Sequence, residues 1–449
     1  MELKIENFGP IKSFDDNFQR LNVFIGEQAS GKSTICKLVY FALSLRDEML
    51  DLFGNTKFFK TENCLKFYNS RCKNRFMNYF GSTYNMNRFN IKFKYESNNA
   101  IELNLREPEG QNYRFLNIAF NDRTKIESLL KSIQDYQKHF AQKDDEAEMF
   151  EYKIKKEKII NNIFDYFGFT EELIYIPAVR SIITTMSLQE QDLQEIFQTN
   201  ILETEDEDDE NANIIFKVDS ITKKFIKDIF RKIKPKFVDG VDGLLKELRS
   251  RQKYSSRTND FLNEAYNYFE MILKGKIYQK DDGEFLKIIN TSKAIRFNLA
   301  SSGQQECVWI MCYLFLIIAE DKQVVLFVEE PESHLFTKAQ KDLIDFILLA
   351  LNFKNKNIFF ITTHSSYVLT EISNYIYAGL LEKDKLPEII KKELILEKNK
   401  SHVFFLKNGN VRPVLKNNQI IESDFIDNEV NNEIEKLFNA LLENDNAVN

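Results

Sequence analysis

The chain has 449 residues, of which 43% are hydrophobic and 29% are charged, an ordinary composition for a globular protein. Its net charge of −7 excludes a uniformly basic nucleic-acid coat, although a local basic patch can still bind a phosphate backbone. The longest apolar run, 307–319, is shorter than the roughly 20 residues that a membrane-spanning helix requires. We therefore expect a buried helix there and no membrane segment.

The first residues, MELKIENFG, carry charges from the second position and no basic flank leading into an apolar segment, so no signal peptide is expected. The cytoplasm is the compartment that we predict. Five cysteines, an odd number without a CxxC pair, suggest neither a disulfide framework nor a zinc site. We expect reduced, mostly buried thiols.

Residues 1–26 alternate apolar and polar side chains, break at Gly9 and Pro10, and resume in an apolar run at 21–25. This pattern predicts strands, the last of them buried. After the next glycine, apolar side chains at helical spacing predict a helix over residues 33–49. A strand, a glycine loop and a helix in this order form half of a βαβ unit.

The glycine loop reads GEQASGKS and fits GxxxxGK[ST], in the strand-loop-helix setting that this phosphate-binding motif requires. Glycines let backbone N–H groups surround a phosphate at a helix N-terminus, and Lys32 adds a positive charge for the β- and γ-phosphates. The Ser33 hydroxyl is a ligand for Mg²⁺. The predicted ATP-binding residues are Gly26, Gln28, Ala29, Ser30, Gly31, Lys32, Ser33 and Thr34.

Between about residues 125 and 277 the chain is rich in Lys and Glu, which predicts a helical insertion. Apolar a and d positions are not kept over three or four heptads, so we expect a short arm rather than a long coiled-coil rod. A β-like run near 172–181, ELIYIPAVRS, indicates that the chain returns to the core sheet inside the insertion. The acidic run 203–211 is expected to be a flexible loop.

A basic segment at 221–237 interleaves Lys and Arg with Phe and Ile at helical spacing. One interpretation is a helix that contacts nucleic acid. The other is a helix whose apolar stripe packs on the arm while its lysines face water.

From about residue 295 the strand and helix patterns return. SSGQQE opens the apolar helix, QVVLFVEE reads as a buried strand, a helix follows, and NIFFITTHSS reads as another buried strand. These elements resume a parallel α/β core. The end of the chain predicts a hairpin around Asn408, Gly409 and Asn410, followed by a helix over residues 432–443.

Two adjacent acids and a histidine stand at the carboxyl ends of the two buried strands, where α/β sheets present their ligands. We assign Glu329 to the magnesium shell and Glu330 to orienting or deprotonating the attacking water, although acids here can also cap a helix. His364 is placed to contact the γ-phosphate, although a strand-end histidine can be structural. Glu330, His364 and Lys32 form the predicted catalytic set.

In the order GEQASGKS, SSGQQE, VVLFVEEPE and ITTHSS, these segments resemble the Walker A, signature, Walker B and switch-histidine motifs of ABC ATPases. The insertion, EEPESHL and YIPAVRS are more similar to chromosome-maintenance, recombination-repair and OLD-type ATPases than to transporter subunits. The resemblance implies an α/β ABC ATPase head with a mixed sheet and a P-loop core, interrupted by a large helical insertion. It also implies a homodimer or higher homo-oligomer. Its signature residues Ser302, Gly303 and Gln304 would close over the ATP of another subunit.

The sequence departs from the family pattern in two places. Glu329 stands where many ABC ATPases have Asp, and the glutamine that usually joins the magnesium site is not assigned. Its candidates are Gln111, Gln189 and Gln191. Arg180 is a candidate phosphate or interface contact.

The chain divides into four predicted parts: an N-terminal lobe (1–120), the insertion (121–290), a C-terminal ATPase lobe (291–385) and a hairpin with a helix (386–449). The chain resembles the ATPase subunits of Septu and PARIS systems and the ATPase half of OLD nucleases. That resemblance implies a sensor or scaffold in anti-phage defence.

Only 85 residues follow His364, without a DxD-type acidic cluster, so we expect a nuclease or toxin effector to be a separate protein. The alternative is a DNA repair or chromosome-maintenance ATPase that clamps duplex DNA. A transporter ATPase would need a smaller helical lobe.

Overall fold

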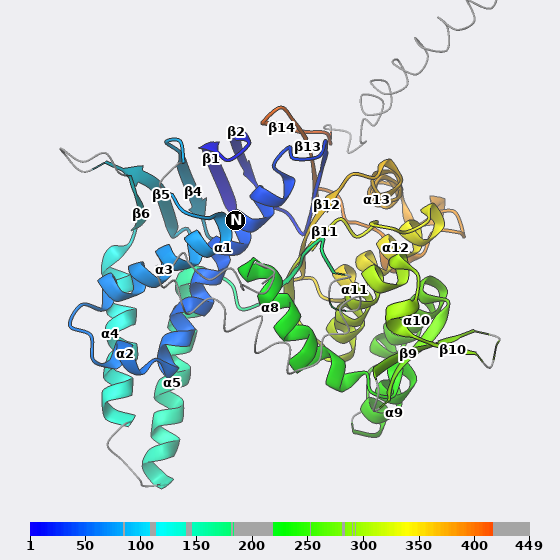
Figure 1. Cartoon of the computed structure of the whole chain (residues 1–449), viewed down its shortest axis with the longest axis horizontal. Helices are drawn as coiled ribbons and strands as arrows, with labels where there is room; N and C mark the ends of the chain where they lie inside the picture. Colours follow the sequence, from blue (N-terminus) through cyan, green and yellow to red (C-terminus); the bar gives the residue numbers. More distant parts are fainter. Residues whose placement is uncertain are drawn as a thin grey trace, which may run out of the picture.

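The computed structural model carries one large mixed sheet with helices on both faces (Figure 1). The structure describes residues 1–83, 86–107, 114–140, 146–180, 183, 219–251, 253–280, 283–289, 291 and 293–415. The acidic run 203–211 and the predicted terminal helix 432–443 lie outside these residues.

The strands of the described part form an 11-stranded sheet in the order β6-β5-β4-β1-β2-β14-β13-β3-β12-β11-β7 and a 3-stranded sheet in the order β10-β9-β8. Their bounds are β1 Glu2–Phe8, β2 Ile11–Asn17, β3 Leu21–Gly26, β4 Asn90–Lys94, β5 Ala100–Arg106, β6 Phe115–Phe120, β7 Glu172–Ile176, β8 Gly275–Lys280, β9 Gly283–Ile288, β10 Ala294–Arg296, β11 Val324–Glu329, β12 Ile358–Thr363, β13 Ser401–Lys407 and β14 Asn410–Pro413.

The α-helices cover both faces of the large sheet. Their bounds are α1 Lys32–Leu50, α2 Thr56–Phe59, α3 Cys64–Phe80, α4 Arg123–Phe140, α5 Glu146–Phe167, α8 Ser220–Asp228, α9 Gly240–Arg251, α10 Ser256–Leu273, α11 Ser302–Ala319, α12 Thr337–Phe353 and α13 Ser366–Ala378. Short 3-10 or π turns are η1 Asp51–Gly54, η2 Ile229–Ile233, η3 Lys234–Lys236, η4 Phe297–Leu299, η5 Lys383–Lys385 and η6 Lys392–Leu394.

The sheet has an antiparallel part, in which β6, β5, β4, β1 and β2 pair in turn, and a parallel part, in which β13, β3, β12, β11 and β7 run alongside one another. Both kinds of pairing in one sheet around a P-loop strand confirm the predicted α/β class with a mixed sheet. Strand β7 lies beside β11, where the run ELIYIPAVRS was expected to return to the core. The boundaries of the four predicted parts stay a prediction.

Alternate side chains of the central strands pack into two separate hydrophobic cores. In β3, Val23 and Ile25 pack with the core of α10, α11, α12 and α13, whereas Phe24 packs with the core of α1 and α3. This alternation follows from the two-residue period of a strand, and both faces are apolar because helices cover each of them. Figure 1 shows the two helical layers on opposite sides of the parallel strands.

The C-terminal hairpin adds a central strand that comes from the far end of the chain. Asn408 and Gly409 both have positive φ, at 52° and 78°, as a tight two-residue turn between β13 and β14 requires. β13 then pairs in parallel with β3, directly beside the glycine loop. The predicted hairpin is confirmed. The sequence did not indicate that its first strand would lie beside β3.

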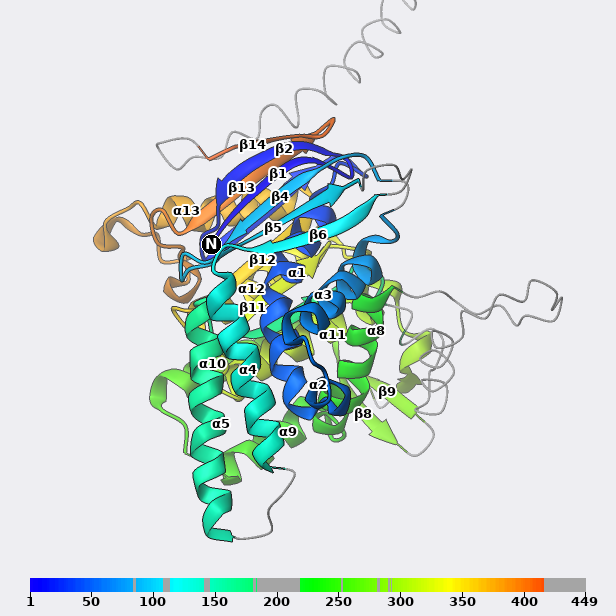
Figure 2. The same ribbon diagram turned by 90° about the vertical axis from the view of Figure 1, so that its left-hand side faces the viewer.

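Helices α4 and α5 form an antiparallel pair that projects from the sheet (Figure 2). By length and composition alone, the apolar helix α11 could cross a membrane. However, 89% of its 18-residue stretch Ser302–Ala319 is buried inside the protein. It is therefore the core helix that the sequence predicted. The five thiols are free, and four of them are buried.

Candidate functional site

The glycine loop leads from the end of β3 into the first turn of α1. Gly31 caps α1 with φ 103°, and no side chain occupies the cap. Ala29 also adopts a left-handed conformation, with φ 58°. The first N–H groups of a helix have no partner within that helix, so this uncapped turn offers donors and a positive dipole end to an anion.

Two glycines are required here by close packing. A Cβ at Gly26 would lie 2.1 Å from the carbonyl oxygen of Leu406 on β13. A Cβ at Gly31 would lie 2.3 Å from a methyl carbon of Ile11. At Gly26 the obstacle is main chain, so a larger residue would move the loop away from β13. At Gly31 the obstacle is a side chain, and the positive φ is the stronger reason for glycine.

Lys32 is buried and directs its ammonium group across the loop. Its Nζ donates to the carbonyl oxygens of Gly26 at 2.8 Å and Glu27 at 2.7 Å. Burial lowers the pKa of Lys32, and the nearby carboxylates of Glu330 and Glu332 partly oppose that shift. The ammonium group therefore lies inside the loop, among the acids that follow β11.

Glu329 ends β11 and is buried. Its carboxylate accepts hydrogen bonds from the Tyr175 hydroxyl at 2.6 Å and the Ala178 N–H at 3.1 Å. Burial raises the pKa of the Cys36 thiol on α1, and the charge of Glu329 raises it further. Ser33 precedes Cys36 by three residues, so the two lie on the same face of α1. The Ser33 hydroxyl and the Glu329 carboxylate are of the oxygen-ligand type that Mg²⁺ prefers.

Glu330 and His364 meet at the ends of β11 and β12. The imidazole Nε2 lies 3.1 Å from Glu330 Oε1, and Nδ1 lies 3.5 Å from Lys32 Nζ. If the ammonium group donates to Nδ1, the other ring nitrogen carries the proton and donates to the carboxylate. The predicted catalytic set, drawn from three distant segments, therefore forms one continuous chain of side chains.

The backbone of Glu330 is strained, with φ 42°. Its N–H donates to the Thr362 carbonyl oxygen on β12 at 2.9 Å, which holds the residue in this conformation. A left-handed conformation costs a non-glycine residue of the order of 1–3 kcal/mol, and such residues cluster at active sites.

Arg180 has a different role from the one predicted. Its side chain is 0% exposed and donates to the carbonyl oxygens of Glu306, Pro177, Glu329 and Glu330 at 2.6–3.1 Å. It also faces the Glu306 carboxylate at 3.2 Å. The interpretation of Arg180 as a phosphate or interface contact is wrong, because the buried side chain instead joins α11 to the main chain of both acids.

The signature-like segment begins α11. Ser301 caps the helix in a reciprocal capping box with Gln304, whose amide group also donates to the Leu273 carbonyl oxygen at 2.7 Å. Ser302 is exposed at the first turn. A Cβ at Gly303 would lie 2.6 Å from the His334 carbonyl oxygen, so this turn packs on the loop that follows β11. Gln304 thus makes its contacts within its own chain, whereas Ser302, like Ser301, is exposed to solvent.

A cavity of about 470 Å³ adjoins the start of α1. It is lined by Asn7, Phe8, Gly9, Thr34, Lys37, Tyr79, Phe80, Met86, Asn87 and Phe89. Aromatic rings and amide groups of this kind can hold a planar base, and the cavity shares Thr34 with the predicted phosphate-binding turn.

The basic segment 221–237 packs into the core through Phe225, Ile229 and Ile233. Four of its seven basic residues are paired within the protein: Lys224 and Lys232 with Asp228, Lys234 with Glu284, and Lys236 with Glu320. This arrangement favours the packing interpretation over a nucleic-acid contact. The glutamine candidates Gln111, Gln189 and Gln191 lie outside the described residues.

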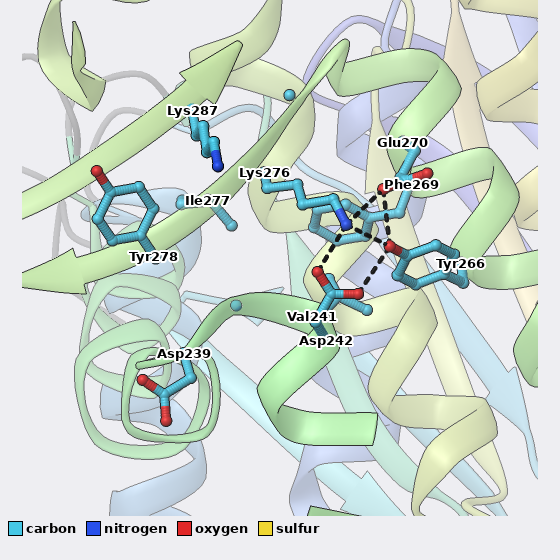
Figure 3. Close-up of a pocket in the computed structure, with 12 residues that line it drawn as sticks. Asp239, Val241, Asp242, Tyr266, Phe269, Glu270, Lys276, Ile277, Tyr278 and Lys287 are labelled. Atoms are coloured by element: carbon cyan, nitrogen blue, oxygen red, sulfur yellow. Dashed lines mark hydrogen bonds and ion pairs between the residues drawn. The ribbon is translucent and has the colours of Figure 1, made fainter. Parts of the chain in front are cut away.

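Figure 3 shows a separate cavity of about 180 Å³ between the start of α9, α10 and β8. The ammonium group of Lys276 lies 2.7 Å from Asp242 and 2.8 Å from the hydroxyl of Tyr266, which in turn lies 2.7 Å from Glu270. Burial raises the pKa of Tyr266 to about 12, so its hydroxyl stays protonated. These groups bind one another, so they form a local network of α9, α10 and β8 rather than a part of the candidate site.

Sequence reasoning missed two contributions to this site. Glu332 accepts a hydrogen bond from the His364 N–H at 2.7 Å, and Tyr175 donates to Glu329. The last acidic residue of EEPE, Glu332, was a visible signal for the first contribution. Nothing in the sequence indicates the partner of either one, because β7, β11 and β12 become neighbours only in the sheet.

A family model described as AAA ATPase domain matches residues 1–369, whereas no curated protein matches significantly. Three solved structures are similar over 92% of this chain at 11% identity: the SmcHead bound to the C-winged helix domain of ScpA (TM-score 0.38, 96% of that chain), the SMC head domain from Thermotoga maritima (0.36, 97%) and the recombination mediator protein RecF-ATPrS in the RecFOR pathway (0.32, 97%). This level of likeness carries no information about activity or partners.

Proposed function

The chain belongs to the AAA ATPase domain family, and from this premise we propose that it binds ATP with Mg²⁺, dimerises around the nucleotide and hydrolyses it. The observation that carries the proposal is the continuous chain of Lys32, His364 and Glu330 beside an uncapped helix N-terminus. It joins a cation for phosphate oxygens, an imidazole and a carboxylate in a single site.

The phosphates bind at the first turn of α1, where the N–H groups and Lys32 face them, and the base enters the cavity lined by Phe8 and Tyr79. Ser33 and Glu329 are the residues that we assign to hold Mg²⁺. Bound Mg²⁺ would offset the charge of the β- and γ-phosphate oxygens.

Glu330 orients the attacking water and accepts its proton as the bond between the β- and γ-phosphates breaks. His364 donates from Nε2 to Glu330 and keeps that carboxylate turned toward Lys32. The strained backbone at Glu330 supports this role, since strain at one carboxylate persists only where the surrounding loops hold it.

Dimerisation is supported by exposed apolar side chains around the site. Leu299, Phe336 and Tyr367 are 72%, 79% and 61% exposed. Leu299 ends η4 before α11, Phe336 is the N-cap of α12, and Tyr367 lies in the first turn of α13. The Ser365 hydroxyl donates to Gln340 at 2.7 Å, which ties the starts of α12 and α13 together. Phe336 and Tyr367 thus lie at two linked helix starts, and exposed apolar groups that gather in one region favour a protein partner.

A mixing experiment tests whether Ser302 acts on the partner's nucleotide. Lys32→Met disables the P-loop and Ser302→Arg disables the signature, so each variant alone should be inactive. Mixed together, they should recover up to about one quarter of wild-type turnover per chain, since half of random dimers are mixed and each has one intact site of two. A mixture as inactive as its components would contradict a site shared between subunits.

At the level of biological role, we propose a sensor or scaffold that controls a separate nuclease or toxin in anti-phage defence. The support is the similarity of EEPESHL and YIPAVRS to OLD-type ATPases, together with the length of the chain and the lack of a long coiled-coil arm. The alternative, a clamp on duplex DNA, is less favoured because several basic side chains of 221–237 already pair with acids of the same protein.

Co-purification with the products of neighbouring genes separates these roles. A tagged Glu330→Gln chain should retain a nuclease or toxin-like protein in the presence of ATP and release it with ADP. Wild-type chain with ADP is the matched control. A homodimer that carries DNA and no second protein would instead assign the chain to DNA clamping.

A further inference from the structure

Glu332 lies in the loop after β11, outside the proposed catalytic set of Glu330, His364 and Lys32. Its Oε1 accepts two hydrogen bonds from the end of β12, one from the Thr363 hydroxyl and one from the His364 N–H, both at 2.7 Å. His364 is the first residue beyond β12, where the strand ladder no longer provides an acceptor. Glu332 therefore provides that acceptor for the main chain of the histidine.

The two loops are linked in both directions. The Glu330 N–H donates to the Thr362 carbonyl oxygen at 2.9 Å, and the His364 N–H donates back to Glu332. Thr363 Oγ1 also accepts the Ser365 N–H at 3.0 Å. These bonds set where the imidazole stands relative to Glu330.

The position is costly for a carboxylate. Oε2 of Glu332 is buried without a hydrogen-bond partner among the described residues, and Glu329 and Glu330 stand three and two residues away. An unsatisfied buried acceptor lowers the stability of the fold, so stability alone does not favour an acid here. Departures of this kind from full hydrogen bonding are expected at functional sites.

We propose that Glu332 is a positioning residue that holds His364 where its imidazole bridges Lys32 and Glu330, and that it acts through His364 rather than on the nucleotide. The inference rests on the proposed function, in which His364 keeps Glu330 in place for hydrolysis. It predicts that Glu332 matters only while His364 is present.

A double-mutant cycle on ATP turnover tests this dependence. Glu332→Ala should lower kcat by about 10–100-fold with little change in KM, a loss like that seen when the hydrogen-bond partner of a metal-binding side chain is removed. His364→Ala should give a similar loss, and the double variant should be no slower than His364→Ala. Glu332→Gln keeps an oxygen that accepts both hydrogen bonds, so it should retain most of the wild-type rate.

Each result has one interpretation. If His364→Ala turns over ATP like wild type, the proposed role of His364 fails, and the inference fails with it. If His364→Ala is slow while Glu332→Ala is normal, or if the two losses multiply, only the inference fails. The inference alone also fails if Glu332→Gln is as slow as Glu332→Ala. In that case the charge of Glu332, and not its two hydrogen bonds, would matter. Should Glu332→Ala not fold, Thr363→Val takes its place in the cycle.

Discussion

Glu330→Gln is expected to lower ATP turnover by about 10²–10⁴-fold, the usual contribution of a general base, while ATP binding is retained. The substitution removes the carboxylate that accepts the proton but keeps its shape. The amide oxygen can still accept from His364 Nε2, and the backbone N–H still reaches the Thr362 carbonyl oxygen. The loop should therefore stay in place around an intact nucleotide, and the dimer should accumulate in its closed form.

Steady-state kcat, the Kd for a fluorescent ATP analogue and the oligomeric state with ATP and Mg²⁺ would check this result. Glu247→Gln is the matched control, because Glu247 is exposed on α9 and pairs with Arg251 on the surface. That variant should keep the wild-type rate. Near-normal turnover by Glu330→Gln would remove Glu330 from the chemistry, and a loss of ATP binding would assign it to the ligand instead.

Arg180→Met is expected to lower the free energy of unfolding by about 3–5 kcal/mol, the cost of breaking a buried ion pair by removing one partner. The guanidinium group faces the Glu306 carboxylate and donates to four main-chain carbonyl oxygens. Methionine fills a similar volume without any donor, so those acceptors lose their partner inside the protein. The loss should also disturb Glu330, whose carbonyl oxygen is one of the four.

Urea unfolding followed by circular dichroism would measure the change. Arg249→Met is the control, since Arg249 is exposed on α9 and its bond to Asn263 lies at the surface. That variant should change stability by no more than about 0.5 kcal/mol. Equal unfolding midpoints for the two variants would show that the buried arginine does not hold the two elements together.

The sequence alone determined the local parts of this protein. The strand, glycine loop and helix around Lys32, and the acids and histidine at the ends of two buried strands, were all predictable. Such patterns are readable because strand and helix periods and glycine loops depend on residues close together in the chain. The carboxyl ends of parallel strands share one edge of a sheet, which also placed the catalytic set together in advance.

Only the tertiary structure decided which distant groups serve that site. Arg180 joins the main chain of Glu329 and Glu330 to α11, and Glu332 holds the backbone of His364. The strand 401–407 enters the sheet beside β3 from the far end of the chain. These partners depend on strand order and on the packing of helices over the sheet. Residue spacing does not encode either one, because an isolated arginine or glutamate in a loop carries the same local signal whether it faces water or the core.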